Sequence, residues 1–118
     1  MERIADMASS WRSGDELLDA LSALANPNRL RIIAVLHEGR NYVSQLAREV
    51  GLSRPLLYMH LKKLEEAGLV SGSLELSEDG KAMKFFEVAE FEITLTPGLL
   101  AAAAATLDGG DENREVEG

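Results

Sequence analysis

Residues 43–70, VSQLAREVGLSRPLLYMHLKKLEEAGLV, contain two short helical patterns separated by a tight turn. Apolar residues recur at helical spacing over about 43–50 and again over about 54–67. Gly51 suits the left-handed backbone that ends a helix, and Ser53 is a strong N-cap for the next one. The pattern predicts a helix-turn-helix, a compact pair suited to laying its second helix in a major groove of DNA.

The second helix of this pair has two different faces. Its expected core seam is Leu57, Leu61 and Leu64, spaced at i, i+4 and i+7. The side chains that project away from the seam are Pro55, Tyr58, Met59, Lys62 and Glu66. Because a free surface gains little from exposing both Tyr58 and Met59 to water, this face indicates an interface.

Cations on this helix fit contact with nucleic acid. Arg54 lies at the N-terminal tip, where an arginine can donate two hydrogen bonds to a guanine edge. Lys62 and Lys63 suit phosphates, which position a helix without reading sequence. Surface lysines are also commonly just solvated, and for either lysine taken alone that alternative stays open.

Two helices are expected before this pair. Ser13 and Glu16 have the spacing of a capping box that starts the first one. Asn26-Pro27 ends that helix and begins a second, about 27–38, which stops at Gly39. The first helix carries an apolar stripe of Leu17, Leu18, Leu21 and Leu24. The second is expected to bury Leu30, Ile33, Ala34 and Leu36.

After Gly68 the hydrophobic period changes from about 3.6 to about 2, which predicts strands. One strand starts at Val70, Asp79-Gly80 is a hairpin signal, and a return strand covers about 82–88. A further extended stretch alternates over 90–95 and is the candidate third strand. The predicted fold is α+β, a winged helix-turn-helix with about five helices and a two- to three-stranded β-wing.

The last helix begins at Thr96-Pro97 and is apolar nearly all round. A helix without a polar face in so small a chain should be buried on more than one side. Its expected partner is the same helix, or the leucine stripe of residues 17–24, in a second subunit; the alternative is packing on its own domain. The residues expected at this homodimer interface are Leu17, Leu18, Leu21, Leu24, Leu99, Leu100, Ala103, Ala104 and Leu107.

The chain of 118 residues is expected to form one domain over 13–107, with dimerisation helices at both ends. Residues 1–12 are expected to be an N-terminal leader, either a short helix or a loose segment. Residues 108–118, DGGDENREVEG, have the composition of a disordered acidic tail. No apolar run reaches the roughly 18 residues of a membrane span, and the first residues lack a signal peptide's apolar stretch. A cytoplasmic location without a membrane partner is therefore expected.

The formal net charge of −8 argues against nucleic acid, because phosphate binding requires Lys and Arg. The distribution of charge changes that interpretation. Residues 26–72 carry seven basic and four acidic side chains, whereas residues 73–118 carry three basic and eleven acidic ones. The positive block coincides with the helix-turn-helix, which favours a local basic face.

The segments LSALANPNRLRIIAVLHEG and VSQLAREVGLSRPLLYMHLKKLEEAGLV resemble the ArsR-like winged-helix repressors. The likeness covers roughly residues 17–88 and is most specific over 43–70. It implies a symmetric dimer built from the first and last helices, with two recognition helices in adjacent major grooves and wings reaching the DNA backbone or minor groove. The DNA-contacting residues that it implies are Ser44, Gln45, Ser53, Arg54, Pro55, Tyr58, Met59, His60 and Lys62, with Lys81 and Lys84 in the wing. Lys63, on the flank of the same helix, joins this set from the helix projection alone.

Two departures from the family pattern affect these expectations. Positions that are often small and hydroxylated in the family are Leu56 and Tyr58 here, so base contacts are expected to be more apolar. The wing tip is Glu78-Asp79, which phosphate repels, and this weakens the expected role of the wing.

No metal, cofactor or catalytic activity is expected. Metal-sensing members of the resembled family use cysteines in the first helix of the pair, or histidines and carboxylates in the last helix. This chain has no cysteine, and its last helix has no histidine. His60 is expected to be structural or to contact phosphate, and no nucleophile motif or Gly-rich phosphate loop is present. The sequence leaves the effector open.

A protein-interaction module built on a winged helix is the alternative to a DNA-binding regulator. The acidic wing tip, the net charge and the exposed Tyr58 and Met59 favour this alternative. The positive middle block, with Arg54, Lys62 and Lys63, favours double-stranded DNA as the partner.

Overall fold

The computed structural model describes residues 13–107, so the expected leader and acidic tail lie outside the described residues. The described chain divides into two compact units. One unit is residues 20–90, and the other combines residues 13–19 with residues 91–107. No helix between residues 13 and 107 is long and apolar enough to cross a membrane.

Five helices form within this range, as predicted. Each side-chain cap comes from a residue type that favours helix starts, because its oxygen accepts a hydrogen bond from a free backbone N–H. Asn26 accepts from the N–H groups of Asn28 and Arg29 at 2.9 and 3.2 Å, and Thr96 accepts from Leu99 at 3.0 Å. The helices are α2 (Gly14–Leu24), α3 (Pro27–His37), α4 (Val43–Val50), α5 (Arg54–Glu66) and α6 (Pro97–Ala104).

The wing is a three-stranded antiparallel sheet in the order β1-β3-β2. Its strands are β1 (Asn41–Tyr42), β2 (Val70–Leu76) and β3 (Ala82–Val88). Phe85 pairs with Tyr42 on one side and with Ser73 on the other. The prediction that 90–95 supplies a third strand was wrong. The third strand is β1, which already occupies the edge of β3 where a continuation of the meander would have paired.

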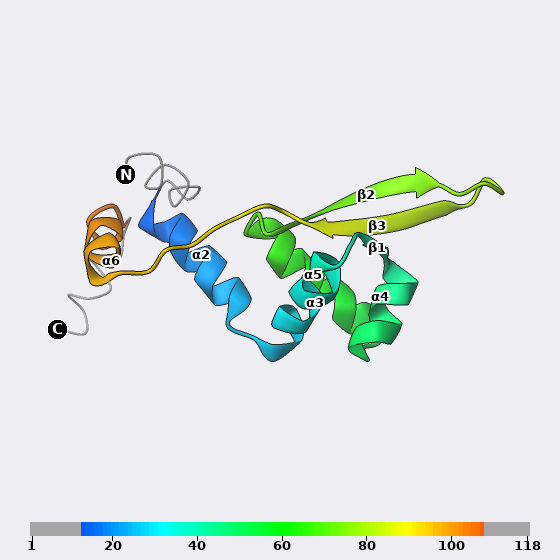
Figure 1. Cartoon of the computed structure of the whole chain (residues 1–118), viewed down its shortest axis with the longest axis horizontal. Coiled ribbons are helices and arrows are strands. Elements are labelled where there is room, and N and C mark those ends of the chain that lie inside the picture. Colours follow the sequence, from blue (N-terminus) through cyan, green and yellow to red (C-terminus); the bar gives the residue numbers. More distant parts are fainter. Residues whose placement is uncertain (1–12, 108–118) are drawn as a thin grey trace. The chain divides into compact units, whose positions relative to one another are not determined.

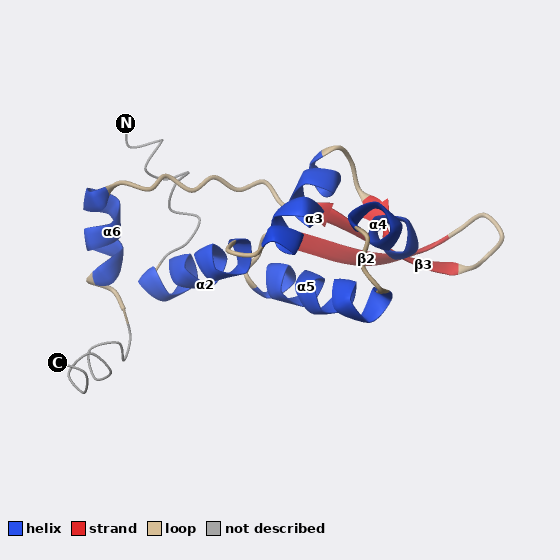
Figure 2. Cartoon of the chain, turned by 90° about the horizontal axis from the view of Figure 1, so that it is seen from below, coloured by secondary structure: helices blue, strands red, loops and turns tan. Residues whose placement is uncertain are grey.

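Helices α3, α4 and α5 gather on one side of the sheet, and the far part of the β2–β3 hairpin extends past them (Figures 1 and 2). The predicted seam of α5 is confirmed, because Leu57, Leu61 and Leu64 are all buried. Apolar burial of this kind contributes about 25 cal/mol per Å² and is the main force that holds the helices to the sheet. The other buried residues of this unit are Ala20, Ala23, Ile32, Leu36, Val43, Leu46, Ala47, Leu69, Val70 and Phe86.

The expected core face of α3 was partly wrong. Ile32 and Leu36 are buried, one turn apart, but Leu30 and Ala34 are exposed and Ile33 is half-buried. The segment LRIIAVL is apolar on most sides, so its pattern does not single out one face. The position of β3, α4 and α5 around the helix decides which residues turn inward.

In the second unit, the start of α2 lies against α6. The N–H of Gly14 donates to Thr106 Oγ1 at 2.6 Å, and a Cβ on Gly14 would collide with the carbonyl of Ala103. No residue of α6 is buried in the described chain, although the helix is almost entirely apolar. The leucine stripe of α2 divides: Leu17 is buried, Leu18 is exposed, and Leu21 and Leu24 are half-buried.

Adjacent leucines in α5 provide a test of this core. Leu57 is 0% exposed and Leu56 is 46% exposed. We expect Leu57→Ala to lower the free energy of unfolding by about 2–5 kcal/mol, because it removes buried methyl groups and leaves a cavity. Leu56→Ala, with the same chemistry on the same helix, is expected to cost about 1 kcal/mol or less. Urea denaturation at fixed protein concentration measures both, and equal losses would contradict the burial pattern.

Candidate DNA-binding surface

The turn between α4 and α5 sets the direction of the second helix. Gly51 has φ 73°, a left-handed conformation that costs other residues free energy, and its N–H donates to the Ala47 carbonyl at 2.9 Å. Two residues later the Ser53 hydroxyl caps α5 by accepting from the Leu56 N–H at 3.4 Å. Both turn residues therefore act as predicted, and α5 leaves the turn with its N-terminal tip exposed.

The outward face of α5 is exposed where the sequence predicts it. Tyr58 is 45% exposed and Met59 is 59% exposed, with Leu56 beside them in the same turn. Arg54 stands at the start of the helix, and its planar guanidinium suits the edge of a guanine. The predicted site residues that are exposed on this helix and its cap are Ser53, Arg54, Pro55, Tyr58, Met59, Lys62 and Lys63.

The predicted contacts on α4 have a different setting. Ser44 and Gln45 are half-buried. The Gln45 amide donates through Nε2 to Glu49 Oε2 at 2.7 Å and accepts through Oε1 from Arg48 at 2.5 Å. Its orientation is therefore fixed by two neighbours on the same helix. The spacing of these residues, i, i+3 and i+4 on one helix, is the signal that could have predicted this engagement.

His60 lies at the edge of the core rather than on the outward face. Its Nδ1 is 3.1 Å from Nη1 of Arg29, whose Nε also donates to the Ala23 carbonyl at 2.6 Å. A guanidinium only donates, so Nδ1 accepts and the neutral ring carries its proton on Nε2. Burial, and then the positive charge of Arg29, lowers the pKa of His60. This contact fixes the ring on the middle of α5.

The wing offers less positive charge than the helix. Lys81 is exposed, while the Lys84 ammonium lies 5.5 Å from the centre of the Phe86 ring. At the tip, Glu78 and Asp79 are both exposed, and Asp79 is bonded to the Ser77 hydroxyl. Hydrogen bonds from that hydroxyl and from the Lys81 N–H lower the pKa of Asp79, which keeps the tip negative.

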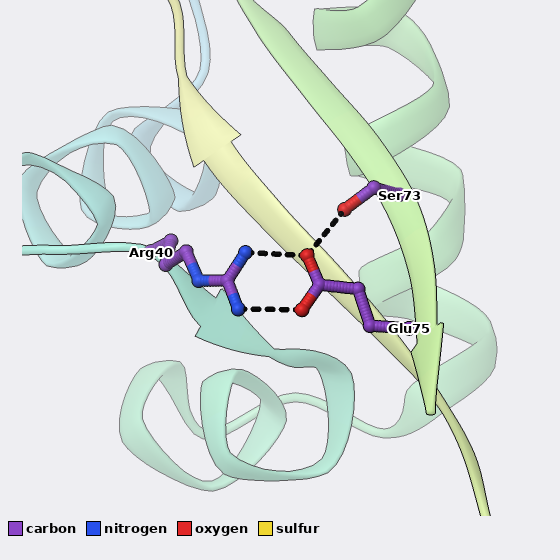
Figure 3. A network of polar contacts seen from close by, with 3 residues as sticks. All are labelled: Arg40, Ser73 and Glu75. Carbon is purple, nitrogen blue, oxygen red and sulfur yellow. Dashed lines mark hydrogen bonds and ion pairs between the residues drawn. The ribbon is translucent and has the colours of Figure 1, made fainter. Parts of the chain in front are cut away.

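Arg40 forms a contact that the sequence did not predict. Its guanidinium donates to both carboxylate oxygens of Glu75, at 2.6 and 2.7 Å, and Ser73 Oγ donates to the same carboxylate at 3.3 Å (Figure 3). The guanidinium carbon also lies 4.3 Å from the centre of the Phe85 ring. Arg40 and Glu75 lie 35 positions apart, and the strand that follows Arg40 has two residues. The sequence therefore carries no signal that links them.

Within residues 13–107, no three His, Cys, Asp or Glu side chains gather as they would around a metal ion. The exposed side chains of α5 offer hydrogen bonding, charge and apolar contact. Those interactions are the ones that recognise DNA grooves and phosphates.

Comparison with known proteins identifies the family of this chain. Residues 26–71 match the family model described as bacterial regulatory protein, arsR family. The chain is also 41% identical over 70 residues to an uncharacterised helix-turn-helix transcriptional regulator of Methanocaldococcus jannaschii. That match covers 59% of this chain and 73% of the relative. The chain belongs to the arsR family of bacterial regulatory proteins.

Two other transcriptional regulators extend the comparison. A transcriptional repressor named SmtB from Mycobacterium tuberculosis is 41% identical over 61 residues, which is 48% of this chain and 45% of that protein. A crystal structure of a possible transcriptional regulatory protein from Mycobacterium bovis has a TM-score of 0.58 at 26% identity, covering 64% of this chain and 76% of that one. The predicted resemblance and the winged helix-turn-helix fold are confirmed.

A solution structure from the same organism supports the fold alone. It is described as a homodimeric winged helix-turn-helix DNA-binding domain, and has a TM-score of 0.57 at 24% identity. The match covers 86% of this chain and 83% of that one.

The contact between His60 and Arg29 predicts a pH dependence of stability. With the pKa of His60 lowered in the folded chain, stability that is present above the unfolded histidine's pKa is lost as the pH falls through the folded value. From about pH 7.5 to about pH 5, we expect the wild-type free energy of unfolding to decline more than that of His60→Gln, whose amide still accepts a hydrogen bond but does not titrate.

Urea denaturation at each pH measures this difference. His37→Gln is the matched control, because His37 is exposed at the end of α3. The same pH dependence in wild type and His60→Gln would rule out His60 as its source.

Proposed function

We propose that this chain is a sequence-specific, DNA-binding transcriptional repressor that acts as a homodimer. The observation that carries the proposal is the exposed face of α5, which follows a capped turn on an arsR-family scaffold and begins with Arg54. The seam of buried leucines occupies the other side of α5, so this face is free to enter a groove.

Each part of the surface has a separate role in the proposal. Arg54 donates to a guanine edge and carries base discrimination. Lys62 and Lys63 bind phosphates and fix the register of the helix on the duplex. Tyr58 and Met59 pack against thymine methyl groups. The residues proposed to complete the surface are the exposed Ser53 and Pro55 and, at its margin, the half-buried Ser44, Gln45 and His60.

The wing has a secondary role. Lys81 supplies its exposed positive charge, and Lys84 lies close to Phe86. The negative tip is unfavourable next to phosphate, so the wing approaches the DNA backbone with its Lys81 side rather than with Glu78 and Asp79.

The homodimer is proposed to use α2 and α6. An apolar helix without a single buried residue is costly in water, and Leu18 and Leu100 are both exposed large hydrophobic residues. A second copy that covers these helices removes that cost, and the resulting symmetric dimer carries two copies of α5. On this proposal residues 13–107 act as one domain, and the remaining interface residues are Leu17, Leu21, Leu24, Leu99, Ala103, Ala104 and Leu107.

The proposal includes a cytoplasmic location, where DNA is accessible, and no enzymatic activity. Regulation of transcription requires only that the protein occupy DNA. Repression is proposed because relatives such as the SmtB protein are named transcriptional repressors.

The DNA-binding proposal is tested with duplexes selected from a random-sequence library by the purified protein. We expect the logarithm of affinity to fall steeply with the logarithm of salt concentration, and Lys62→Ala to reduce that slope by about 0.9 for each phosphate that the helix no longer neutralises. Arg54→Ala should instead lose about 1–3 kcal/mol of discrimination at one base pair. Fluorescence anisotropy titrations measure both.

Arg31→Ala is the matched control for these charge changes, because Arg31 is an exposed arginine of α3 outside the proposed surface. An equal decrease of slope in Arg31→Ala would show that overall charge, rather than α5, determines binding. Failure of the library to yield any bound duplex would overturn the proposal.

A protein-interaction module is the second candidate, and a specific observation favours it. Leu74 and Leu76 are 68% and 75% exposed on the wing, close to the acidic tip. Apolar residues beside negative charge suit a protein surface better than a phosphate backbone. Salt-independent binding to a protein, together with no selected DNA, would favour this candidate.

The homodimer proposal is tested by placing a charge in α6. We expect Leu100→Glu to weaken the dimer about a hundredfold or more, because it buries an unpaired carboxylate at the interface. Leu76→Glu is the matched control on the wing and should leave the dimer intact. Sedimentation velocity over a range of concentrations measures the dissociation constant, and an unchanged dimer in Leu100→Glu would exclude α6 from the interface.

A further inference from the structure

Three side chains from the three strands, together with Arg40 directly before β1, form one cluster on the face of the sheet that points away from the helices. Phe86 is buried on the helix side of β3, so its neighbour Phe85 projects from the opposite face. There the Phe85 ring meets Tyr42 edge-on, with 5.8 Å between ring centres, and lies under the Arg40 guanidinium at 4.3 Å. Arg40 reaches across β3 to Glu75 on β2 (Figure 3).

This contact supports the part of the wing that the helices leave without support. On the helix side, Phe86 and Val70 are buried near the base of the hairpin. Toward the tip, Leu74 and Leu76 on the same side are largely exposed, so no helix of the described chain backs the sheet there. Glu75 lies between these two leucines and points to the other face, where Arg40 binds it.

The same segment connects the wing to the helix-turn-helix. Arg40 stands directly before β1, and β1 leads without a break into α4. Asn41 Nδ2 donates to Glu49 Oε2 on α4 at 3.5 Å, and Glu49 also accepts from Gln45. The far part of the wing is therefore joined to α4 through Glu75, Arg40 and the two residues of β1.

We propose that Arg40 and Glu75 are positioning residues of the wing: their bidentate contact over the Phe85 ring fixes the angle of the β2–β3 hairpin relative to α4, so that Lys81 reaches phosphate while α5 occupies the groove. The inference rests on the proposed function of DNA binding. Neither residue touches DNA in this scheme. Their effect is geometric. The charge attraction of an exposed pair is weak, but the two parallel hydrogen bonds and the contact with the Phe85 ring hold the guanidinium in one orientation.

Two alternatives to this role make different predictions. If only the charges mattered, a lysine at position 40 would serve as well as arginine. A lysine ammonium cannot make the two parallel hydrogen bonds or stack flat on the ring. If the pair only added stability, its removal would loosen the whole domain, including α5, rather than the wing alone.

The test compares Arg40→Gln, Glu75→Gln and Arg40→Lys with wild type, and uses Glu87→Gln as the matched control. Glu87 is a carboxylate of β3 whose negative charge contributes to raising the pKa of Arg40. Amide hydrogen exchange of the free protein is the first measurement. We expect the two glutamine variants to speed exchange in the outer halves of β2 and β3 about fivefold, with α5 unchanged. Arg40→Lys should be intermediate, and Glu87→Gln should match wild type.

DNA affinity and its salt slope, on duplexes selected by the wild-type protein, are the second measurement. We expect about three- to tenfold weaker binding for both glutamine variants. Their salt slope should approach that of a Lys81→Ala reference variant, because the wing no longer reaches phosphate. Unchanged exchange in the wing, equal acceleration in α5, or faster wing exchange with unchanged affinity would each overturn the inference. A wild-type protein that selects no DNA would instead overturn the proposed function, and the exchange experiment would still show whether the pair fixes the wing.

Discussion

Burial of one side of α5 is the constraint on which the rest of this structure depends. Leu57, Leu61 and Leu64 fill the space between α3, α4 and the sheet, and each is almost completely removed from water. Because the seam uses one side of a helix of 13 residues, the other side must face outward. The apolar and basic residues of that outward side are exposed as a consequence of packing, and the proposed contact with DNA uses what the core leaves free.

Local signals explain why much of the fold was predictable. The turn between α4 and α5 follows from Gly51 and Ser53, whose backbone and capping preferences act within a few residues. The outward face of α5 was predicted by subtracting its leucine seam, and the exposure of Arg54 and Met59 agrees with that prediction. The pattern of α3 was less informative, because apolar residues surround most of that helix and its neighbours choose the buried side.

Long-range contacts explain what the sequence did not predict. Strand β1 has two residues, too few for any period to be visible, and β3 recruits it through backbone pairing. The contacts of Arg40 with Glu75 and of Arg29 with His60 join residues 35 and 31 positions apart. Such pairs depend on how the finished elements lie in space, so they add positioning and electrostatic detail that residue type alone does not carry.

The exposure of Met59 has a consequence for the chemical ageing of the protein. A thioether that is 59% exposed is open to dissolved oxidants, which convert it to a polar, chiral sulfoxide. Since the chain contains no cysteine, no thiol competes for those oxidants. A preparation stored in air would therefore gradually present a more hydrophilic helix surface beside Tyr58, with its leucine core intact.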